Sequence, residues 1–221
     1  QTFKINKNRS MKVFKFGGAS LKNSQGFHNV ASIIKEHSKE PLLVVVSAIG
    51  KTTNALERVV ALAQAKKDYQ SVLLEIHHQH KQIIIELKLE ADTINQYLET
   101  IMHTIAIKAE AAGEYDFIYD QVVSQGEILS SALLFSFIQS KNFSVQWIDA
   151  RNYIYTDETY REGKVNWSQA QASIKSLNEI LQKKIIITQG FIGGSTHNST
   201  TTLGREGSDF SAAIFATCLM A

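Results

Sequence analysis

Residues 185–213, which read IIITQGFIGGSTHNSTTTLGREGSDFSAA, decide the fold of this 221-residue chain. Three consecutive isoleucines at the start of this segment indicate a buried strand. The glycines that follow predict a long loop without regular structure that continues to Ser208; they stand at positions 190, 193, 194, 204 and 207. A helix is expected to begin at Ser208 and Asp209, because small polar side chains cap helices and free backbone N–H groups there attract anions.

Patterns typical of strands alternate with patterns typical of helices along the rest of the chain. Strands are predicted at residues 11–16, 42–46, 145–148 and 185–188, with a short edge strand at 153–155. Helices are predicted near Gln25, after Thr53, over 68–110 and 116–140, and from Ser168. The alternation predicts a three-layer αβα sandwich with a mainly parallel sheet. Ligands of such sheets lie beyond the carboxyl ends of the strands, so the loops 17–18, 47–53 and 190–208 are expected to converge.

The segment 68–110 is expected to form a helical hairpin that breaks near residues 90–92. It contains His77, His78 and His80. Without cysteine or carboxylate at metal spacing, these histidines are interpreted as a solvated helix face.

Composition excludes several classes of protein. Charge is nearly balanced at +2, so the sequence indicates neither a nucleic-acid partner nor a membrane surface. The apolar run 42–46 is too short to cross a bilayer, and the one cysteine, Cys218, is expected to be a buried thiol. A chain without possible internal disulfides fits a reducing compartment, and a cytoplasmic location is predicted. Residues 1–10 are interpreted as a leader or tag-like extension outside a domain that covers 11–221.

Two motifs have both a structural and a functional interpretation. Gly17 and Gly18 join a strand to a helix, a geometry that lets backbone N–H groups approach phosphate oxygens, although most such junctions are only tight turns. Ser124-Gln125-Gly126-Glu127 is expected at the start of an apolar helix. On residue type alone, Glu127 would cap that helix or complement its dipole.

Six dispersed motifs resemble those of the aspartate kinases, members of the amino-acid kinase family. They are KFGGAS (15–20), SAIGKTTN (47–54), SQGE (124–127), QWIDAR (146–151), ITQGFIG (187–193) and TTTLGREGSD (200–209). Ala19 stands where the usual motif has threonine. Glu206 stands where it has a second glycine, so the Glu206 side chain is expected to point to solvent.

The resemblance implies transfer of a phosphoryl group from ATP, with Mg²⁺, to the side-chain carboxylate of L-aspartate, which gives 4-phospho-L-aspartate for lysine, threonine and methionine biosynthesis. Its implied catalytic residues are Lys15, which neutralises charge on the transferring group, and Asp209, which orients Lys15 or meets Mg²⁺; no fixed metal site is assigned. Implied nucleotide contacts are Lys15, Phe16, Gly17, Gly18 and Ser20. Implied substrate contacts are Ser47, Thr53, Glu127, Phe191, Arg205 and Ser208.

In the family, the residues that recognise adenine and ribose follow the helix at Ser208, and regulatory domains of the ACT type follow those. The chain is therefore expected to hold the amino-acid-binding part without the nucleotide half, and to be inactive when isolated. A homo-oligomer is expected for the full-length form.

Three other readings remain open. A sister kinase could act on acetylglutamate, glutamate, uridylate or carbamate, and Glu127 with the GREGSD loop is the feature that favours aspartate. A non-catalytic aspartate-binding module is distinguished by the absence of aspartate-dependent ADP formation. A plain α/β domain without a site would require six coincident motifs.

Overall fold

The computed structural model describes residues 11–89 and 92–221. Its central sheet contains β1 (Lys12–Phe16), β2 (Leu42–Val46), β5 (Ile185–Gln189) and β3 (Val145–Trp147), in the order β1-β2-β5-β3. All three pairings in this sheet are parallel. Every carboxyl end therefore lies at the same edge, which confirms the predicted arrangement of the sheet.

Strand β2 shows why the sheet is covered on both faces. Its five residues are fully buried, and each such aliphatic side chain contributes roughly 1.5–3 kcal/mol of burial free energy. Leu42, Val44 and Val46 belong to one hydrophobic core, whereas Leu43 and Val45 belong to the other. A continuous apolar run thus alternates between two cores, as the period of a strand requires.

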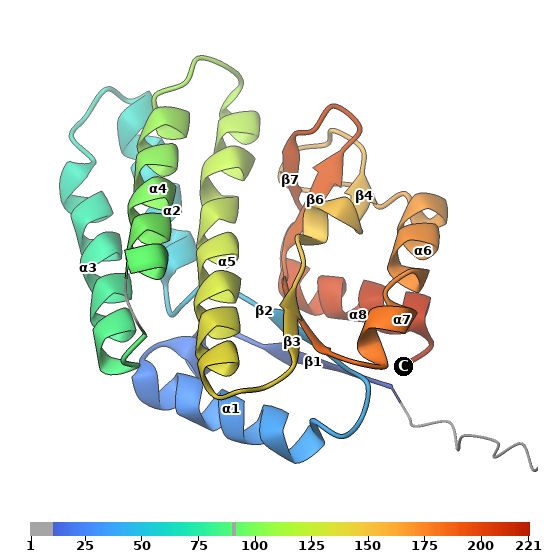
Figure 1. Cartoon of the computed structure of the whole chain (residues 1–221). Coiled ribbons are helices and arrows are strands. Elements are labelled where there is room, and N and C mark those ends of the chain that lie inside the picture. Colours follow the sequence, from blue (N-terminus) through green and yellow to red (C-terminus); the bar gives the residue numbers. More distant parts are fainter. Residues whose placement is uncertain (1–10, 90–91) are drawn as a thin grey trace, which may run out of the picture.

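The two cores are closed by two layers of helices, which confirms the three-layer sandwich (Figure 1). On one face lie α1 (Ser24–His37), α2 (Thr52–Gln64), α3 (Gln70–Glu86), α4 (Asp92–Ala109) and α5 (Tyr115–Ser140). On the other lie α6 (Trp167–Lys175), α7 (Asn178–Leu181) and α8 (Gly207–Leu219). Two short 3₁₀ segments, η1 (Gly18–Leu21) and η2 (Ala150–Asn152), follow β1 and β3.

The expectation of an irregular loop up to Ser208 is wrong. The segment forms a hairpin of β6 (Ile192–Ser195) and β7 (Thr200–Thr202), and β4 (Tyr155–Thr156) pairs with β6 in a second sheet. Its glycines serve close packing. A Cβ at Gly193 would lie 2.8 Å from the Ile154 carbonyl oxygen, so only glycine lets the hairpin approach the segment before β4 this closely.

Glu127 is not at the start of a helix. It is in the middle of α5, which begins twelve residues earlier at Tyr115. The polar residues that suggested a helix start are buried inside the protein. The Ser124 and Gln125 side chains donate to the Gln121 carbonyl within the helix, whereas Glu127 is bonded to residues outside it. Burial of satisfied polar groups within a long helix leaves no signal in its apolar periodicity.

The helical hairpin of α3 and α4 is present, and its expected break at Glu90 and Ala91 lies outside the described residues. The leader interpretation of residues 1–10 also lies outside them. The helix expected from Ser168 is divided into α6 and α7. Cys218 is buried, as predicted.

The interpretation of the three histidines as a solvated face is wrong for His80. This side chain is fully buried, and its Nδ1 lies 2.7 Å from the Ile76 carbonyl oxygen. Burial lowers its pKa to about 4, so it is neutral at physiological pH. Only His77 and His78 keep contact with solvent.

Helix α5 is, within the part of the chain that the structure describes, the one helix long and apolar enough to cross a membrane. Its most apolar window is 78% buried inside the protein. Such burial is typical of the central helix of a packed domain.

Candidate active site

Lys15 and Asp209 meet at the carboxyl edge of the sheet. Lys15 is near the end of β1, and its Nζ donates to Asp209 Oδ2 at 3.1 Å. Asp209 lies in the first turn of α8, where a carboxylate is stabilised by the helix dipole. The lysine side chain is 25% exposed and the aspartate 63%, so this ion pair faces solvent and can rearrange around a ligand.

The diglycine turn lies directly on the loop after β2. A Cβ at Gly18 would lie 2.7 Å from the Gly50 carbonyl oxygen, and the Gly50 N–H donates to the Gly18 carbonyl at 2.9 Å. Among residues 11–89 and 92–221, no acceptor is bonded to the N–H groups of Gly17 and Gly18. These two donors are available to an anion beside Lys15 Nζ, which would lie 3.5 Å from a Cβ on Gly17.

Three loops converge at this edge through backbone contacts. The Ser47 N–H donates to the Phe16 carbonyl at 3.0 Å, and the Gly190 N–H donates to the Val46 carbonyl at 2.8 Å. A Cβ on Gly190 would lie 2.7 Å from the Cβ of Ser208. The ends of β1, β2 and β5 and the start of α8 are therefore in contact, as the parallel sheet predicted.

Glu127 reaches this edge from α5. Its side chain is 2% exposed, and Oε1 accepts long hydrogen bonds of 3.4 Å from the Ala48 N–H and the Thr53 hydroxyl. Oε2 is buried without a hydrogen-bond partner in the described part of the chain. Burial raises the pKa of Glu127 to about 8. A buried carboxyl with an unused oxygen can accept a hydrogen bond from a cationic group.

Gly126 lets α5 come close enough for this contact. A Cβ at position 126 would lie 3.1 Å from both the Ala48 Cβ and a Leu56 methyl carbon. The helix is anchored one turn later, where the Ser130 hydroxyl donates to the Ser47 carbonyl at 2.7 Å. The predicted residues Ser47, Thr53 and Glu127 are thus brought together.

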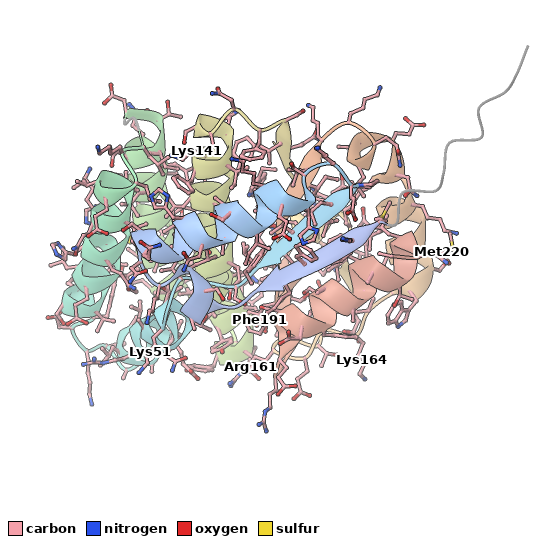
Figure 2. All side chains as sticks on the ribbon, turned by 90° about the horizontal axis from the view of Figure 1, so that it is seen from below. Lys51, Lys141, Arg161, Lys164, Phe191 and Met220 are labelled. Carbon is pink, nitrogen blue, oxygen red and sulfur yellow. The ribbon has the colours of Figure 1, made fainter. Side chains whose placement is uncertain are left out.

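Phe191 forms part of the wall between β5 and α8. Its φ of +68° is in the left-handed region, and its N–H donates to the Ser211 hydroxyl at 2.9 Å. The ring lies against Gly207, where a Cβ would be 2.6 Å from a ring carbon. In Figure 2, Phe191 lies in the same half of the view as Lys51 and Arg161, whereas Lys141 lies in the opposite half.

Arg205 is not brought into contact with the other predicted residues, whereas the Ser20 N–H donates to the Gly17 carbonyl at 2.9 Å. Both are exposed, and the Arg205 side chain has no hydrogen bond or ion pair with any residue for which the structure gives a position. Arg205 lines a shallow pocket on the surface between β7, α6 and α8, together with Lys164, Trp167 and Phe210. Glu206 is exposed, as expected for a side chain that points to solvent, and takes a φ of +56°.

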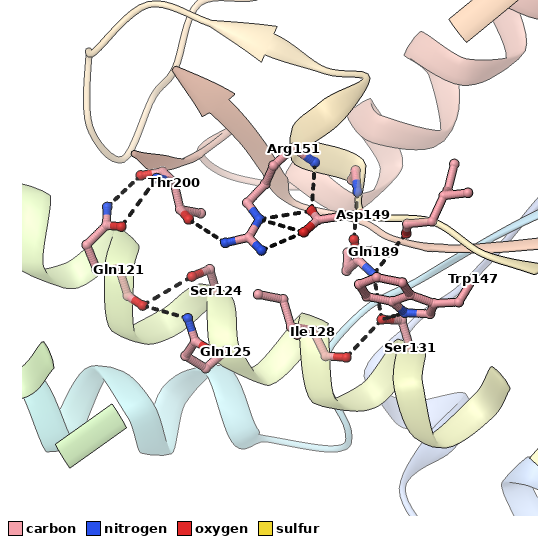
Figure 3. Close-up of polar contacts among 12 residues, drawn as sticks. Gln121, Ser124, Gln125, Ile128, Ser131, Trp147, Asp149, Arg151, Gln189 and Thr200 are labelled. Carbon is pink, nitrogen blue, oxygen red and sulfur yellow. Dashed lines mark hydrogen bonds and ion pairs between the residues drawn. The ribbon is translucent and has the colours of Figure 1, made fainter. Parts of the chain in front are cut away.

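The sequence interpretation missed a polar network that joins α5 to the second sheet (Figure 3). Arg151 pairs with Asp149 and donates to the Thr200 hydroxyl at 3.0 Å. Gln121 donates to the Thr200 carbonyl at 2.7 Å. On the same helix, Asp120 is fully buried and accepts from the Thr202 hydroxyl at 2.7 Å. The QWIDAR motif contained the first pair, but no sequence pattern linked it to α5.

A large cavity lies away from this edge, and no metal cluster marks the edge in the described residues. In the described ranges, no group of three or more His, Cys, Asp or Glu side chains could hold a metal ion. A cavity of about 1240 Å³ lies between α1, α3, α4 and α5 and includes none of the predicted site residues. The chemistry of the converging loops therefore identifies the candidate site, rather than cavity size.

Comparisons with known proteins agree with this geometry. The model of the amino acid kinase family matches residues 10–221. A bifunctional aspartokinase/homoserine dehydrogenase from Buchnera aphidicola is 34% identical over 95% of the chain, which covers 27% of that relative. Lysine-sensitive aspartokinase 3 from Escherichia coli is 31% identical, with 95% of this chain and 46% of the relative covered. The chain thus spans less than half the length of these relatives.

Solved structures similar to this chain are also aspartokinases. E. coli aspartokinase III in complex with aspartate and ADP superimposes with a TM-score of 0.85 at 29% identity, over 96% of this chain and 47% of that one. The aspartate kinase from Clostridium acetobutylicum gives a TM-score of 0.78 at 27% identity, over 96% and 46%.

Proposed function

We propose that this chain, which belongs to the amino-acid kinase family, supplies the amino-acid-binding part of an aspartate kinase. The reaction would transfer the terminal phosphoryl group of ATP to the side-chain carboxylate of L-aspartate, giving 4-phospho-L-aspartate, the first step of lysine, threonine and methionine biosynthesis. The observation that carries the proposal is the buried Glu127 carboxyl, with its unused Oε2, beside the Lys15–diglycine edge. The relatives are aspartokinases, and one was solved with aspartate and ADP.

Glu127 is suited to hold the α-ammonium group of the substrate. An ammonium ion supplies the donors that Oε2 lacks, and its charge offsets the desolvation that raises the pKa of this carboxyl. Thr53 and Ser47 stand beside the same position. Arg205 would bind the α-carboxylate through its planar fork, after its exposed side chain turns toward Glu127.

Lys15 and the Gly17 and Gly18 amides are suited to the transferred phosphoryl group. Phosphoryl transfer depends on positioning and on neutralising charge. The attacking carboxylate has an ordinary pKa near 4, so it is ionised at neutral pH and needs no general base. Asp209 orients Lys15, because the two side chains are already paired at 3.1 Å.

Mg²⁺ would arrive with ATP. Magnesium binds mainly through nucleotide phosphates, water and one or two carboxylates, so a pre-formed protein cluster is not required. Asp209 is the carboxylate beside the phosphate loop that could meet it. At the same edge, Phe16 and Ser20 would contact the nucleotide, and Phe191 and Ser208 would contact the substrate. A cytoplasmic homo-oligomer is the proposed working form.

Calorimetric titration of the chain with L-aspartate, L-glutamate and N-acetyl-L-glutamate tests the substrate, after a check that the chain unfolds cooperatively. Selective binding of L-aspartate is expected. In the complete natural protein, ADP formation that depends on aspartate is expected. Preference for one of the other two ligands would favour a sister kinase, and binding without ADP formation would favour a binding module.

A further inference from the structure

Helix α5 carries a second buried carboxylate, Asp120, in line with Glu127. The two residues are seven positions apart, which places them on one face of the helix about 10 Å apart along its axis. Asp120 is fully buried. None of the roles proposed above uses it.

Asp120 is bonded to two segments outside α5. Oδ1 accepts from the Thr202 hydroxyl at 2.7 Å, and Oδ2 accepts from the N–H groups of Thr202 and Arg161, both at 2.9 Å. Thr202 is the last residue of β7, and Arg161 belongs to the loop between β4 and α6. Asp120, Arg161 and Thr202, called here the α5 clamp, therefore fasten both segments to the helix.

Arg161 has an unfavourable backbone conformation that its contacts stabilise. Its φ of +68° is unfavourable for a residue with a side chain. The guanidinium lies over the Tyr119 ring at 4.4 Å and pairs with Asp116 at 3.4 Å and Glu57 at 3.9 Å. Such a conformation persists when surrounding contacts determine it, and these contacts come from both α5 and α2.

The clamp lies directly before the loop that carries Arg205 and Ser208. Leu203, the residue after Thr202, forms a β-bridge with Glu162, next to Arg161. Gly204 has a φ of +74°, and a Cβ there would lie 3.4 Å from the Arg161 carbonyl oxygen. The backbone that leads to Arg205 is thus held on α5, two turns from Glu127.

We propose that the α5 clamp is a positioning device that sets the spacing between Glu127 and Arg205. This inference rests on the proposed function. The spacing lets Glu127 meet the α-ammonium group of the substrate while Arg205 meets its α-carboxylate. The three clamp residues act through the loop and the helix without touching the reacting atoms. Loss of one clamp bond should therefore weaken the binding of aspartate while the binding of ATP and the rate at saturation change little.

The test compares Thr202→Val with Thr202→Ser in the complete natural protein. Valine is close to threonine in shape and removes only the hydroxyl bond to Asp120, whereas serine keeps it. Tyr69→Phe is the control for stability, because it removes the 2.6 Å bond that joins the residue before α3 to Glu110, the residue after α4, and neither residue belongs to the clamp or the proposed site. KM for aspartate, KM for ATP, kcat and the thermal midpoint are measured for each variant.

Thr202→Val is expected to raise KM for aspartate on the order of tenfold, as for one lost buried hydrogen bond, with KM for ATP unchanged. Thr202→Ser is expected to retain the wild-type KM. The positioning role of the clamp is contradicted if the valine variant keeps the wild-type KM for aspartate. It is also contradicted if the serine or Tyr69→Phe variant shows an equal rise in that KM. A wild-type protein that forms no ADP with aspartate overturns the proposed function itself, which is a different result.

Discussion

The Lys15 ammonium group and the Asp209 carboxylate lie 3.1 Å apart although 194 positions separate them in the chain. Strand β1 supplies one partner and the first turn of α8 the other. This ion pair connects the first strand of the domain to the TTTLGREGSD motif, which ends at Asp209.

Lys15→Ala should reduce turnover on the order of 100-fold or more, because a charge directed at the transferring group is lost. Aspartate binding should be largely intact, since the substrate contacts lie around Glu127. Steady-state kinetics of the complete protein and calorimetry separate these effects. Equal loss of binding and turnover would argue against a role at the phosphate.

Asp209→Asn should spare aspartate binding and lower turnover, because Lys15 loses the charge that orients it. Glu206→Gln is the matched control: this carboxylate is also exposed and stands three residues earlier. Kinetics of both variants decide the role. Unaltered turnover in Asp209→Asn would leave Asp209 a residue that only complements the helix dipole.

Arg205→Ala should weaken aspartate binding by about 2–5 kcal/mol, because the α-carboxylate loses its charged partner. Lys164→Ala removes a positive charge from the same surface pocket and should have little effect. Calorimetry measures both. The assignment of Arg205 fails if its variant binds aspartate as the wild type does.

Glu127→Gln should stabilise the unliganded chain at about pH 8 by on the order of 1–3 kcal/mol and abolish aspartate binding. The Glu127 carboxyl has a pKa of about 8 when folded, against an ordinary value of 4.5. Between these values the folded chain holds the extra proton, so its stability falls as pH rises from about 4.5 through about 8. Urea unfolding at several pH values should show this slope in the wild type and a flatter one in the variant.

The same carboxyl predicts proton release on binding. An ammonium group beside Glu127 favours its ionised form, so aspartate should bind more tightly as pH rises from about 6 to 8, by up to roughly tenfold per unit. Titrations in buffers with different ionisation enthalpies measure the released protons. Binding without proton release would place the ammonium group elsewhere.

His80→Leu should raise stability more at about pH 5 than at pH 8. The unfolded histidine takes up a proton near its ordinary pKa of 6.5, but folded His80 stays neutral to about pH 4, with His77 adding a small repulsion. Stability therefore falls as pH falls from about 6.5 to 4, by on the order of 2 kcal/mol. Thermal unfolding at both pH values tests this; an equal change at both would assign the effect to packing.

The sequence predicted the sheet because β2 is a continuous apolar run and β5 begins with three isoleucines, as is typical of parallel strands covered on both faces. It also predicted that the loops at Gly17, Ser47 and Gly190 meet, because parallel strands end at one edge. It failed for Glu127 and His80, whose polarity suggested a helix start and a solvated face. Glu127 is held by a tertiary contact with the Ala48 N–H, which no periodicity within one helix reports. His80 can be fully buried because its Nδ1 is bonded within its own helix to the Ile76 carbonyl and does not need solvent.

The hairpin of β6 and β7 was missed for a related reason. Glycine was interpreted as a break in regular structure, whereas Gly193 is a strand residue that must let another backbone come close. The clamp on Asp120 was missed because its partners, Arg161 and Thr202, are about 40 and 80 positions away. Long-range polar pairs leave no local pattern.

The close approach of α5 at Gly126 has a consequence for how such proteins diverge. A methyl group at this position would meet the side chains of Ala48 and Leu56 at 3.1 Å, so either these side chains shift by a few tenths of an ångström or the helix moves outward and carries Glu127 with it. Gly126 makes no contact with a ligand itself, yet its lack of a side chain determines how far the Glu127 carboxyl reaches into the site. A homologue could keep every charged residue of this site and still lose its substrate through one added carbon atom.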